Sequence, residues 1–278
     1  MHLIIGYGKW AKGIIHIIFR FKLFKKIIVI NSKKKFILHS KFRRKEIVNR
    51  DFKKIKIKSV HIATPYKTHF KILKQYIKIK KIILEKPLFE NVNQLKIIKN
   101  KIFLIGNYID LYNSELLKFL KKIKLDDKII RINLIYGSSI KNISSRDFLI
   151  DWLEHPLAVL NYILMKKIKN KKYNLSFSLV KNNNKFYISS KFKNINVSII
   201  ICNSVKRIRK IKLCLDNKQY DLNLLKNRED LNKKKTNNIV FLYKHLNFNK
   251  NLFFQKYSFY KKIIEQRIKI LNLVNEKN

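Results

Sequence analysis

The chain has 278 residues, 46% of them hydrophobic, which is enough for a sizeable buried core and excludes a chain that is disordered throughout. Its formal net charge is +47, but the basic residues are spread along the chain beside abundant Ile and Asn, as an AT-rich coding sequence would give, so we expect no nucleic-acid partner. The first residues lack a signal-peptide pattern and no apolar run reaches the ~20 residues of a membrane span, so we expect a cytoplasmic protein without membrane contact.

Short apolar runs alternate with helical patterns over the first part of the chain. The predicted strands cover residues 2–5, 26–30, 36–38, 59–63, 81–84 and 102–105. The predicted helices cover residues 9–21, 43–50, 67–78 and 91–100. This alternation predicts an α/β Rossmann domain over residues 1–106, with a parallel sheet and helices on both faces.

After Gly106 the pattern becomes rich in strands joined by Asn- and Lys-rich turns. The predicted strands cover residues 129–136, 173–180, 185–191, 195–202, 208–215 and 219–225. The predicted helices cover residues 114–122, 155–167 and 254–274. Residues 107–278 are therefore expected to form an α+β domain with an open, mainly antiparallel sheet.

The first motif lies between the first predicted strand and the first predicted helix. It reads Gly6-Tyr7-Gly8-Lys9-Trp10-Ala11, the G-x-G-x-x-A pattern of dinucleotide-binding turns. Gly6 allows the tight turn, Gly8 lets the backbone approach a pyrophosphate, and Ala11 allows close packing of helix on strand. The N-terminus of the helix then offers N–H groups to the phosphates, so the motif predicts a bound NAD or NADP.

The end of the second predicted strand bears on the choice between these two cofactors. An acidic residue there usually binds the ribose 2′-hydroxyl of NAD, but this chain reads Asn31-Ser32 followed by three lysines. An amide, a hydroxyl and lysines suit a 2′-phosphate better, which slightly favours NADP over NAD.

Two further motifs end predicted parallel strands, at the edge where open α/β sheets bind ligands. One is Thr64-Pro65 with His69 four residues on, and the other is Glu85-Lys86-Pro87. A lysine there can reach a carbonyl or alkoxide oxygen, and the neighbouring glutamate can orient it. We expect Lys86 to be catalytic and also to line the cofactor site, together with Thr64, Pro65, His69 and Glu85.

The fourth motif reads Asp151-Trp152-Leu153-Glu154-His155-Pro156. Because Pro156 suits the first position of a helix, we expect His155 at a helix N-terminus, where the dipole disfavours the imidazolium form. A neutral imidazole can take a proton from a hydroxyl, and Asp151 is close enough in sequence to lie beside it. The pattern predicts that Asp151 and His155 are catalytic and that no metal is bound.

These four motifs in this order resemble the Gfo/Idh/MocA family of oxidoreductases, which includes glucose-fructose oxidoreductase and inositol dehydrogenase. The family reads G-x-G-x-x-[GA], then A-T-P-x3-H, then E-K-P, then D-x3-H before a helix. The strand-rich remainder looks like the second domain of the family, an open sheet that binds substrate and often mediates dimerisation. The resemblance thus implies a homo-oligomer, a dimer or a tetramer, although the chain is short for the family.

The resemblance implies hydride transfer between nicotinamide and a carbinol or carbonyl carbon of a sugar or nucleotide sugar. His155 would act as general base, Lys86 would stabilise charge on the oxygen, and Asp151 would bind a hydroxyl or orient His155. The start of the chain looks like members that act on nucleotide sugars in surface-polysaccharide biosynthesis. Two departures concern the substrate: Ala158 stands where the family often has an acid, and Gly106–Asp110 lacks a basic residue that is often found there.

Three alternatives stay open at this point. An imine or enone reductase on the same fold would need no histidine base, so a His155→Ala variant would reduce its substrate normally. A degenerate member would bind a dinucleotide without turnover. A basic nucleic-acid-binding protein would lose binding steeply with salt, but it leaves the four motifs unexplained.

Overall fold

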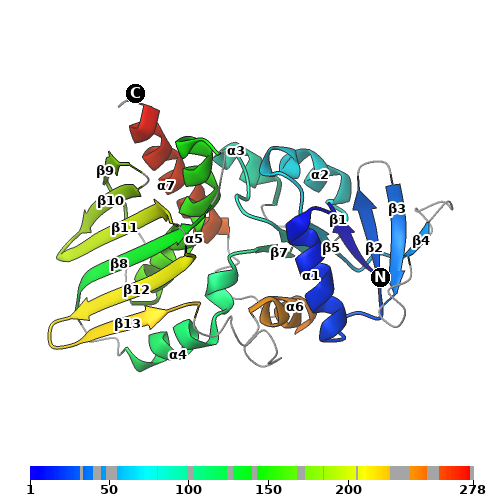
Figure 1. Ribbon diagram of the computed structural model, residues 1–278, viewed down its shortest axis with the longest axis horizontal. Helices are drawn as coiled ribbons and strands as arrows, with labels where there is room; N and C mark the ends of the chain where they lie inside the picture. Colours follow the sequence, from blue (N-terminus) through cyan, green and yellow to red (C-terminus); the bar gives the residue numbers. More distant parts are fainter. Residues whose placement is uncertain are drawn as a thin grey trace. The chain divides into compact units, whose positions relative to one another are not determined.

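A computed structural model describes residues 1–31, 34–39, 45–47, 55–79, 81–98, 103–123, 128–139, 143–167, 173–183, 185–204, 206–225, 238–248 and 257–275 (Figure 1). The chain divides into two compact units. Unit 1 comprises Met1–Asn107 and Asn238–Lys261, and unit 2 comprises Tyr108–Asn237 and Lys262–Asn278. Residues 238–261, which the sequence pattern placed in the second domain, are thus grouped with the first.

Unit 1 is built on a seven-stranded sheet of order β4-β3-β2-β1-β5-β6-β7. Its strands are β1 (His2–Ile5), β2 (Lys26–Asn31), β3 (Lys34–His39), β4 (Lys45–Ile47), β5 (Ser59–Ile62), β6 (Lys81–Leu84) and β7 (Phe103–Gly106). Five neighbouring strands of this sheet run parallel to one another: β2, β1, β5, β6 and β7. Their apolar runs account for this, because parallel strands are covered on both faces, and residues such as Ile4, Val60 and Ile83 are fully buried. The predicted Rossmann-type α/β fold is confirmed.

The edge formed by β3 and β4 departs from the prediction. β3 returns from β2 as an antiparallel hairpin partner, and β4 is antiparallel to β3. The helix predicted over residues 43–50 is wrong where the structure describes it, since residues 45–47 form β4. A short helix is barely stable by itself, whereas pairing with β3 satisfies the backbone N–H and C=O groups of an edge strand.

The helices of unit 1 follow the predicted pattern, with one addition. They are α1 (Lys9–Arg20), η2 (Tyr66–Thr68), α2 (His69–Tyr76), α3 (Val92–Leu95), η3 (Lys96–Ile98) and the unpredicted α6 (Asn238–Phe248). α1 buries Ala11, Ile14, Ile15 and Ile18, the spacing of a helix with one apolar face. α6 packs beside α1, so a segment from late in the chain completes the first unit.

Unit 2 is built on a six-stranded sheet of order β13-β12-β8-β11-β10-β9. Its strands are β8 (Ile129–Ser138), β9 (Phe177–Asn182), β10 (Lys185–Phe192), β11 (Ile195–Asn203), β12 (Ile208–Leu215) and β13 (Gln219–Asn223). β8 and β11 are parallel and all other neighbours are antiparallel, which confirms the predicted open, mainly antiparallel sheet (Figure 1). The remaining elements are η4 (Ile109–Tyr112), α4 (Ser114–Lys122), α5 (Ser145–Lys167) and the part of α7 (Tyr257–Asn275) that follows Lys261.

α5 begins ten residues earlier than the helix predicted to start at His155. Ser144 caps it: its hydroxyl accepts from the backbone N–H of Asp147 at 3.0 Å and donates to the Asp147 carboxylate at 2.7 Å. Pro156 therefore lies inside the helix, and α5 packs on β8 and β11. Within the described ranges, no helix has the length and apolar character needed to cross a membrane.

Candidate functional site

The turn after β1 has the geometry that a dinucleotide-binding motif requires. Gly6 has a φ of +102°, and a Cβ there would lie 2.5 Å from the carbonyl oxygen of Ala63. Only glycine fits both this backbone conformation and this close approach of the ends of β1 and β5. Gly8 is the N-cap of α1 and a Cβ there would meet nothing within 4 Å, so the backbone is open to a ligand where the helix begins.

A hollow of about 530 Å³ opens beside this turn, against α1 and β3. Tyr7 and Leu38 form part of its wall, and Lys12, His16 and Arg20 supply its polar groups. The Lys12 ammonium lies 5.0 Å from the centre of the Tyr7 ring. Lys12 was not singled out in the sequence, because one lysine among so many carries no signal until the fold places it beside the turn.

The end of β2 carries Asn31, which is exposed and pairs with Lys34 across the β2–β3 hairpin. Ser32 lies outside the described residues. No acid occurs at this strand end among the residues described, so the preference for NADP over NAD stays a prediction.

His69 joins the second and third motifs rather than facing an open site. It is fully buried, with Nε2 2.8 Å from the carbonyl oxygen of Thr64 and Nδ1 3.2 Å from that of Leu88. Burial lowers the pKa of His69 although both carbonyls oppose this, so a neutral ring donates to one carbonyl at a time. The hydroxyl of Thr68 donates to the Thr64 hydroxyl at 2.8 Å and lies 2.7 Å from the carbonyl of Pro65, which fixes the loop that contains Thr64 and Pro65.

Glu85, at the end of β6, is the centre of a buried hydrogen-bond network. Its Oε1 accepts from Asn107 Nδ2 at 2.5 Å and from His61 Nε2 at 2.9 Å, and the Trp10 side chain also donates to the carboxylate. Burial acts to raise the pKa of the Glu85 carboxyl, but the bonds from His61, Asn107 and Trp10 outweigh it and lower that pKa. Burial and the charge of Glu85 raise the pKa of Tyr243, so its hydroxyl stays protonated and donates to His61 Nδ1 at 2.7 Å.

This network links the turn after β1 to the Glu85-Lys86-Pro87 motif. Trp10 belongs to the turn, Glu85 to the end of β6 and Asn107 to the end of β7. Asn107 is buried, and its Oδ1 has no hydrogen-bond partner among the described residues, which leaves an acceptor for a ligand donor. Lys86 itself is half-buried directly after β6 and precedes Pro87 through a cis peptide bond. The strand-end position predicted for Lys86 is therefore observed.

In unit 2, α5 carries Asp151 and His155 one helical turn apart, so they share a face of the helix. Asp151 is half-buried and His155 is 4% exposed. The sequence-based reason for a neutral His155 is wrong, because His155 lies in the middle of α5 rather than at its N-terminus. Instead, its ring faces Asp110 and Arg209: Nδ1 lies 3.5 Å from Asp110 Oδ2, and Nε2 lies 3.5 Å from Arg209 Nη2.

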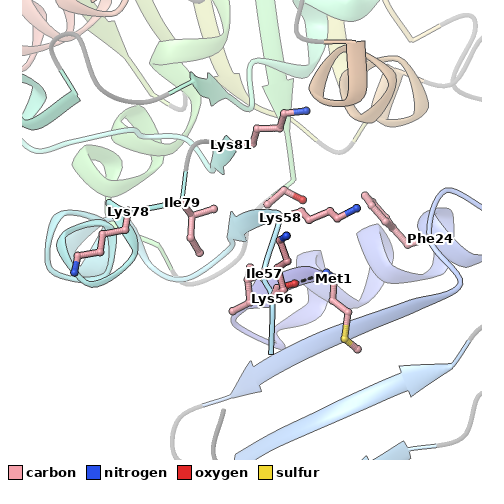
Figure 2. Close-up of a pocket in the computed structure, with 9 residues that line it drawn as sticks. Met1, Phe24, Lys56, Ile57, Lys58, Lys78, Ile79 and Lys81 are labelled. Atoms are coloured by element: carbon pink, nitrogen blue, oxygen red, sulfur yellow. Dashed lines mark hydrogen bonds between the residues drawn. The ribbon is translucent and has the colours of Figure 1, made fainter. Parts of the chain in front are cut away.

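A second hollow of unit 1, of about 740 Å³, lies at the opposite edge of the sheet, before β1, β5 and β6 (Figure 2). Four lysines line it beside apolar side chains such as Phe24 and Ile79. In Figure 2 the ammonium groups of Lys58, Lys78 and Lys81 point in different directions instead of converging. Ligands of parallel sheets bind at the carboxyl ends of the strands, so this lysine-lined hollow is not part of the candidate site.

Solved structures with the same arrangement of elements are dehydrogenases. A dehydrogenase (MviM) from Clostridium difficile is 14% identical, with a TM-score of 0.73 over 100% of this chain and 99% of its own. UDP-N-acetylglucosamine 3-dehydrogenase GnnA from Acidithiobacillus ferrooxidans is 13% identical, with a TM-score of 0.73 over 98% and 96%. A Gfo/Idh/MocA family oxidoreductase from Vibrio cholerae is 10% identical, with a TM-score of 0.70 over 99% and 98%.

The chain has the Gfo/Idh/MocA fold. No protein-family model and no curated protein sequence matches it, so the likeness lies in the structure and in the four motifs. Within this Gfo/Idh/MocA fold, the residues Gly6, Thr64, Glu85 and Lys86 all lie at the carboxyl ends of the parallel strands of unit 1. That edge is where α/β sheets of this kind bind dinucleotides.

Five residues of these clusters were not anticipated from the sequence: His61, Asn107, Tyr243, Asp110 and Arg209. Only for Arg209 does the sequence pattern contain an indication of burial. The inward positions of β12 alternate, and Arg209 falls in the same register as the buried Ile211 and Leu213. A charged residue at an inward position of a strand requires a buried partner of opposite charge, and Asp110 provides it.

Proposed function

We propose that this chain is an NAD(P)-dependent oxidoreductase that transfers a hydride between nicotinamide and a carbinol or carbonyl carbon of a sugar or nucleotide sugar. The observation that carries the proposal is the turn at Gly6, pressed against Ala63 at the carboxyl edge of a parallel sheet, with α1 beginning directly after Gly8. Asn107, with its buried acceptor at the same edge, also fits a cofactor that offers amide donors. NADP is favoured slightly over NAD, and we place the protein in the cytoplasm.

The chain's own residues supply position and charge, while the bound nicotinamide accepts or gives the hydride. In the oxidative direction, His155 takes the proton of the substrate hydroxyl and returns it in the reductive direction. Lys86 stabilises negative charge on the same oxygen. Asp151, on the same face of α5 as His155, binds a second hydroxyl or orients the imidazole.

A nucleotide sugar is the preferred substrate class. GnnA, which shares the fold, is named for its action on UDP-N-acetylglucosamine. The many basic residues of this chain favour an anionic substrate such as a diphosphate-linked sugar, so surface-polysaccharide biosynthesis is the proposed context.

A homo-oligomer, dimer or tetramer, is proposed through the exposed face of the unit 2 sheet. Val180, Tyr187, Ile200 and Ile135 face one another across β9, β10, β11 and β8. Val180 is 58% exposed and Tyr187 38% exposed. Ile200 and Ile135 are half-buried, so the exposed apolar surface of this row lies on β9 and β10, and exposed neighbouring apolar side chains are typical of a surface that another subunit covers.

Titration of the protein with NADPH and with NADH tests the cofactor first. We expect saturable binding, followed by nicotinamide fluorescence, that persists at moderate salt. Binding that disappears with salt would reflect only the basic surface and would contradict the proposal. A screen of nucleotide sugars with the preferred dinucleotide then identifies the substrate.

Lys86→Ala tests the catalytic assignment. We expect a loss in kcat of about 10²–10³-fold, as for removal of one group that stabilises a developing oxyanion, with little change in the dissociation constant for the dinucleotide. Lys67→Ala, which removes an exposed lysine of η2, is the matched control and should leave turnover unchanged. Normal turnover by Lys86→Ala would remove Lys86 from the mechanism.

A further inference from the structure

His155 lies in a closed cycle of three buried residues from three elements. Asp110 of η4 and Arg209 of β12 are each 1% exposed. Nη1 of Arg209 donates to both carboxylate oxygens of Asp110, at 2.6 and 2.7 Å. The other terminal nitrogen, Nη2, faces His155 Nε2 at 3.5 Å, and Asp110 Oδ2 faces Nδ1 at 3.5 Å.

The charges of this cycle disfavour a protonated imidazole. Asp110 and Arg209 neutralise each other, so an imidazolium at His155 would leave one uncompensated positive charge in a buried site. Arg207, whose guanidinium lies 5.7 Å from the Trp152 ring, is a second cation near this cycle: burial and the charge of Arg209 lower its pKa to about 10, although the charge of Asp110 acts to raise it. A further positive charge is therefore costly at this end of β12.

Groups of three other residues lie near the ring, from β8 and α5. Tyr136 of β8 lies nearly parallel to the imidazole, 6.4 Å between ring centres. Glu154, the preceding residue on α5, is paired with Arg267 of α7 at 2.6 Å and accepts from the Tyr108 hydroxyl at 3.0 Å. Asp151 lies one turn away on α5 and is half-buried.

The two nitrogens of the ring are distinguished by what they face. A guanidinium can only donate hydrogen bonds, so the nitrogen beside Arg209 must present its lone pair. A carboxylate can only accept, so the nitrogen beside Asp110 must carry the proton. This arrangement selects the tautomer with a proton on Nδ1 and a lone pair on Nε2.

We propose that Asp110 and Arg209 are positioning residues that hold His155 as the neutral Nδ1–H tautomer, so that Nε2 is the atom that accepts the substrate proton when the substrate hydroxyl displaces the 3.5 Å contact with Arg209. This rests on the proposed function for the role of His155 as base. In the oxidative direction the hydroxyl proton would move to Nε2, and a bound nicotinamide would supply the acceptor for the hydride of the carbinol carbon. The resulting imidazolium keeps its Nδ1–H towards Asp110, and the proton returns in the reverse reaction.

The second buried ion pair of unit 2 provides the matched control. Glu154 and Arg267 are 0% and 2% exposed, as deeply buried as Asp110 and Arg209, and Arg267 Nη1 donates to Glu154 Oε1 at 2.6 Å. Arg267→Met therefore removes a buried cation, as Arg209→Met does, without removing the cation that faces Nε2.

The experiment is NMR of the full chain with isotope-labelled histidine, in which His155→Gln identifies the His155 signal. In the wild type we expect the Nδ1–H tautomer, and an imidazole still neutral at pH 6, below the usual midpoint of about 6.5. In Arg209→Met the protonation midpoint should rise by about 1–3 pH units, because the cation is lost and Asp110 remains. Arg209→Lys should restore the low midpoint, and Arg267→Met should match the wild type.

A double variant keeps the experiment informative if the single variants do not fold. Asp110→Asn with Arg209→Met removes both charges together and leaves neither one buried alone. We expect His155 in this variant to become a mixture of two tautomers. A single Nδ1–H tautomer retained there, or equal midpoints in Arg209→Met and Arg267→Met, would overturn the proposal whatever the turnover is.

The pH profile of kcat separates this proposal from the proposed function. If its acid limb moves with the NMR midpoint in Arg209→Met, while the dissociation constant of the dinucleotide is unchanged, positioning and the role of His155 as base are both supported. If the midpoint moves but the acid limb does not, the positioning stands and the assignment of His155 as base fails.

Discussion

Each unit of this protein buries a histidine against a carboxylate, but the two pairs differ in what the carboxylate does. In unit 1, Glu85 accepts directly from His61 at 2.9 Å, with Asn107 and Trp10 as further donors. In unit 2, Asp110 is held by Arg209 at 2.6 Å, and His155 lies at the longer distance of 3.5 Å.

The difference separates a structural hydrogen bond from a site that can react. The ring of His61 is committed on both nitrogens, to Glu85 and to Tyr243 at 2.7 Å. The ring of His155 is oriented by charge at distances that a substrate can still compete with, because hydrogen bonds of catalytic groups often tighten only when substrate is bound. His61 is thus a structural hydrogen-bonding residue in unit 1, whereas His155 is a candidate base in unit 2.

Truncation of the two carboxylates gives the largest expected effects on stability. Asp110→Ala leaves the Arg209 cation buried and unpaired, which should cost about 3–5 kcal/mol. Glu85→Ala removes the acceptor of the His61, Asn107 and Trp10 side chains, which should cost about 1–3 kcal/mol. Denaturant unfolding of both variants measures this. Equal losses of unfolding free energy would mean that Asp110 does not balance a buried cation more strongly than Glu85 does, which would contradict the difference drawn between the two units.

Alanine substitutions at Gly6 and Gly13 test whether the turn after β1 binds a dinucleotide. Gly6→Ala should destabilise the protein by about 1–3 kcal/mol, because of its positive φ and the contact with Ala63, and should abolish dinucleotide binding. Gly13→Ala, inside α1 where a Cβ meets nothing within 4 Å, should stabilise it by about 0.5–1 kcal/mol. Thermal unfolding and dinucleotide titration of both variants check this, and normal binding by Gly6→Ala would refute the assignment of the turn.

A smaller effect comes from His2, the other buried histidine of unit 1. It is fully buried, its Nδ1 lies 2.7 Å from the Ser59 hydroxyl, and burial followed by the charge of His61 lowers its pKa well below 6.5. The unfolded chain therefore binds a proton that the folded chain does not, so stability is complete above about pH 6.5 and falls as the pH is lowered below it. The slope is at most about 1.4 kcal/mol per pH unit for this group.

His2→Phe should remove that part of the acid sensitivity, as measured by unfolding between pH 7 and pH 5. His16→Gln, which replaces an exposed histidine of α1, is the control and should leave the slope unchanged. If His2→Phe keeps the full slope, another group causes the loss of stability in acid.

Local signals in the sequence were sufficient where a residue's role depends on its neighbours in the chain. The strand, turn and helix around Gly6 were predicted because apolar runs bury on both faces and because glycine marks a conformation that other residues avoid. The strand-end position of Lys86 followed from the same reasoning. A signal that was present but not used is the Ser144–Asp147 cap, which marks the true start of α5.

Partners that lie far apart in the chain were decided by the tertiary structure alone. Asp110 and Arg209 are 99 residues apart, and His61 and Tyr243 are 182 apart. The sequence by itself determined a Rossmann-type domain, a second mainly antiparallel sheet and the positions of Gly6 and Lys86. Only the fold decided what surrounds the His155 ring, because the protonation of a buried imidazole depends on charges within a few ångströms, and sheet pairing, not sequence spacing, brings those charges there.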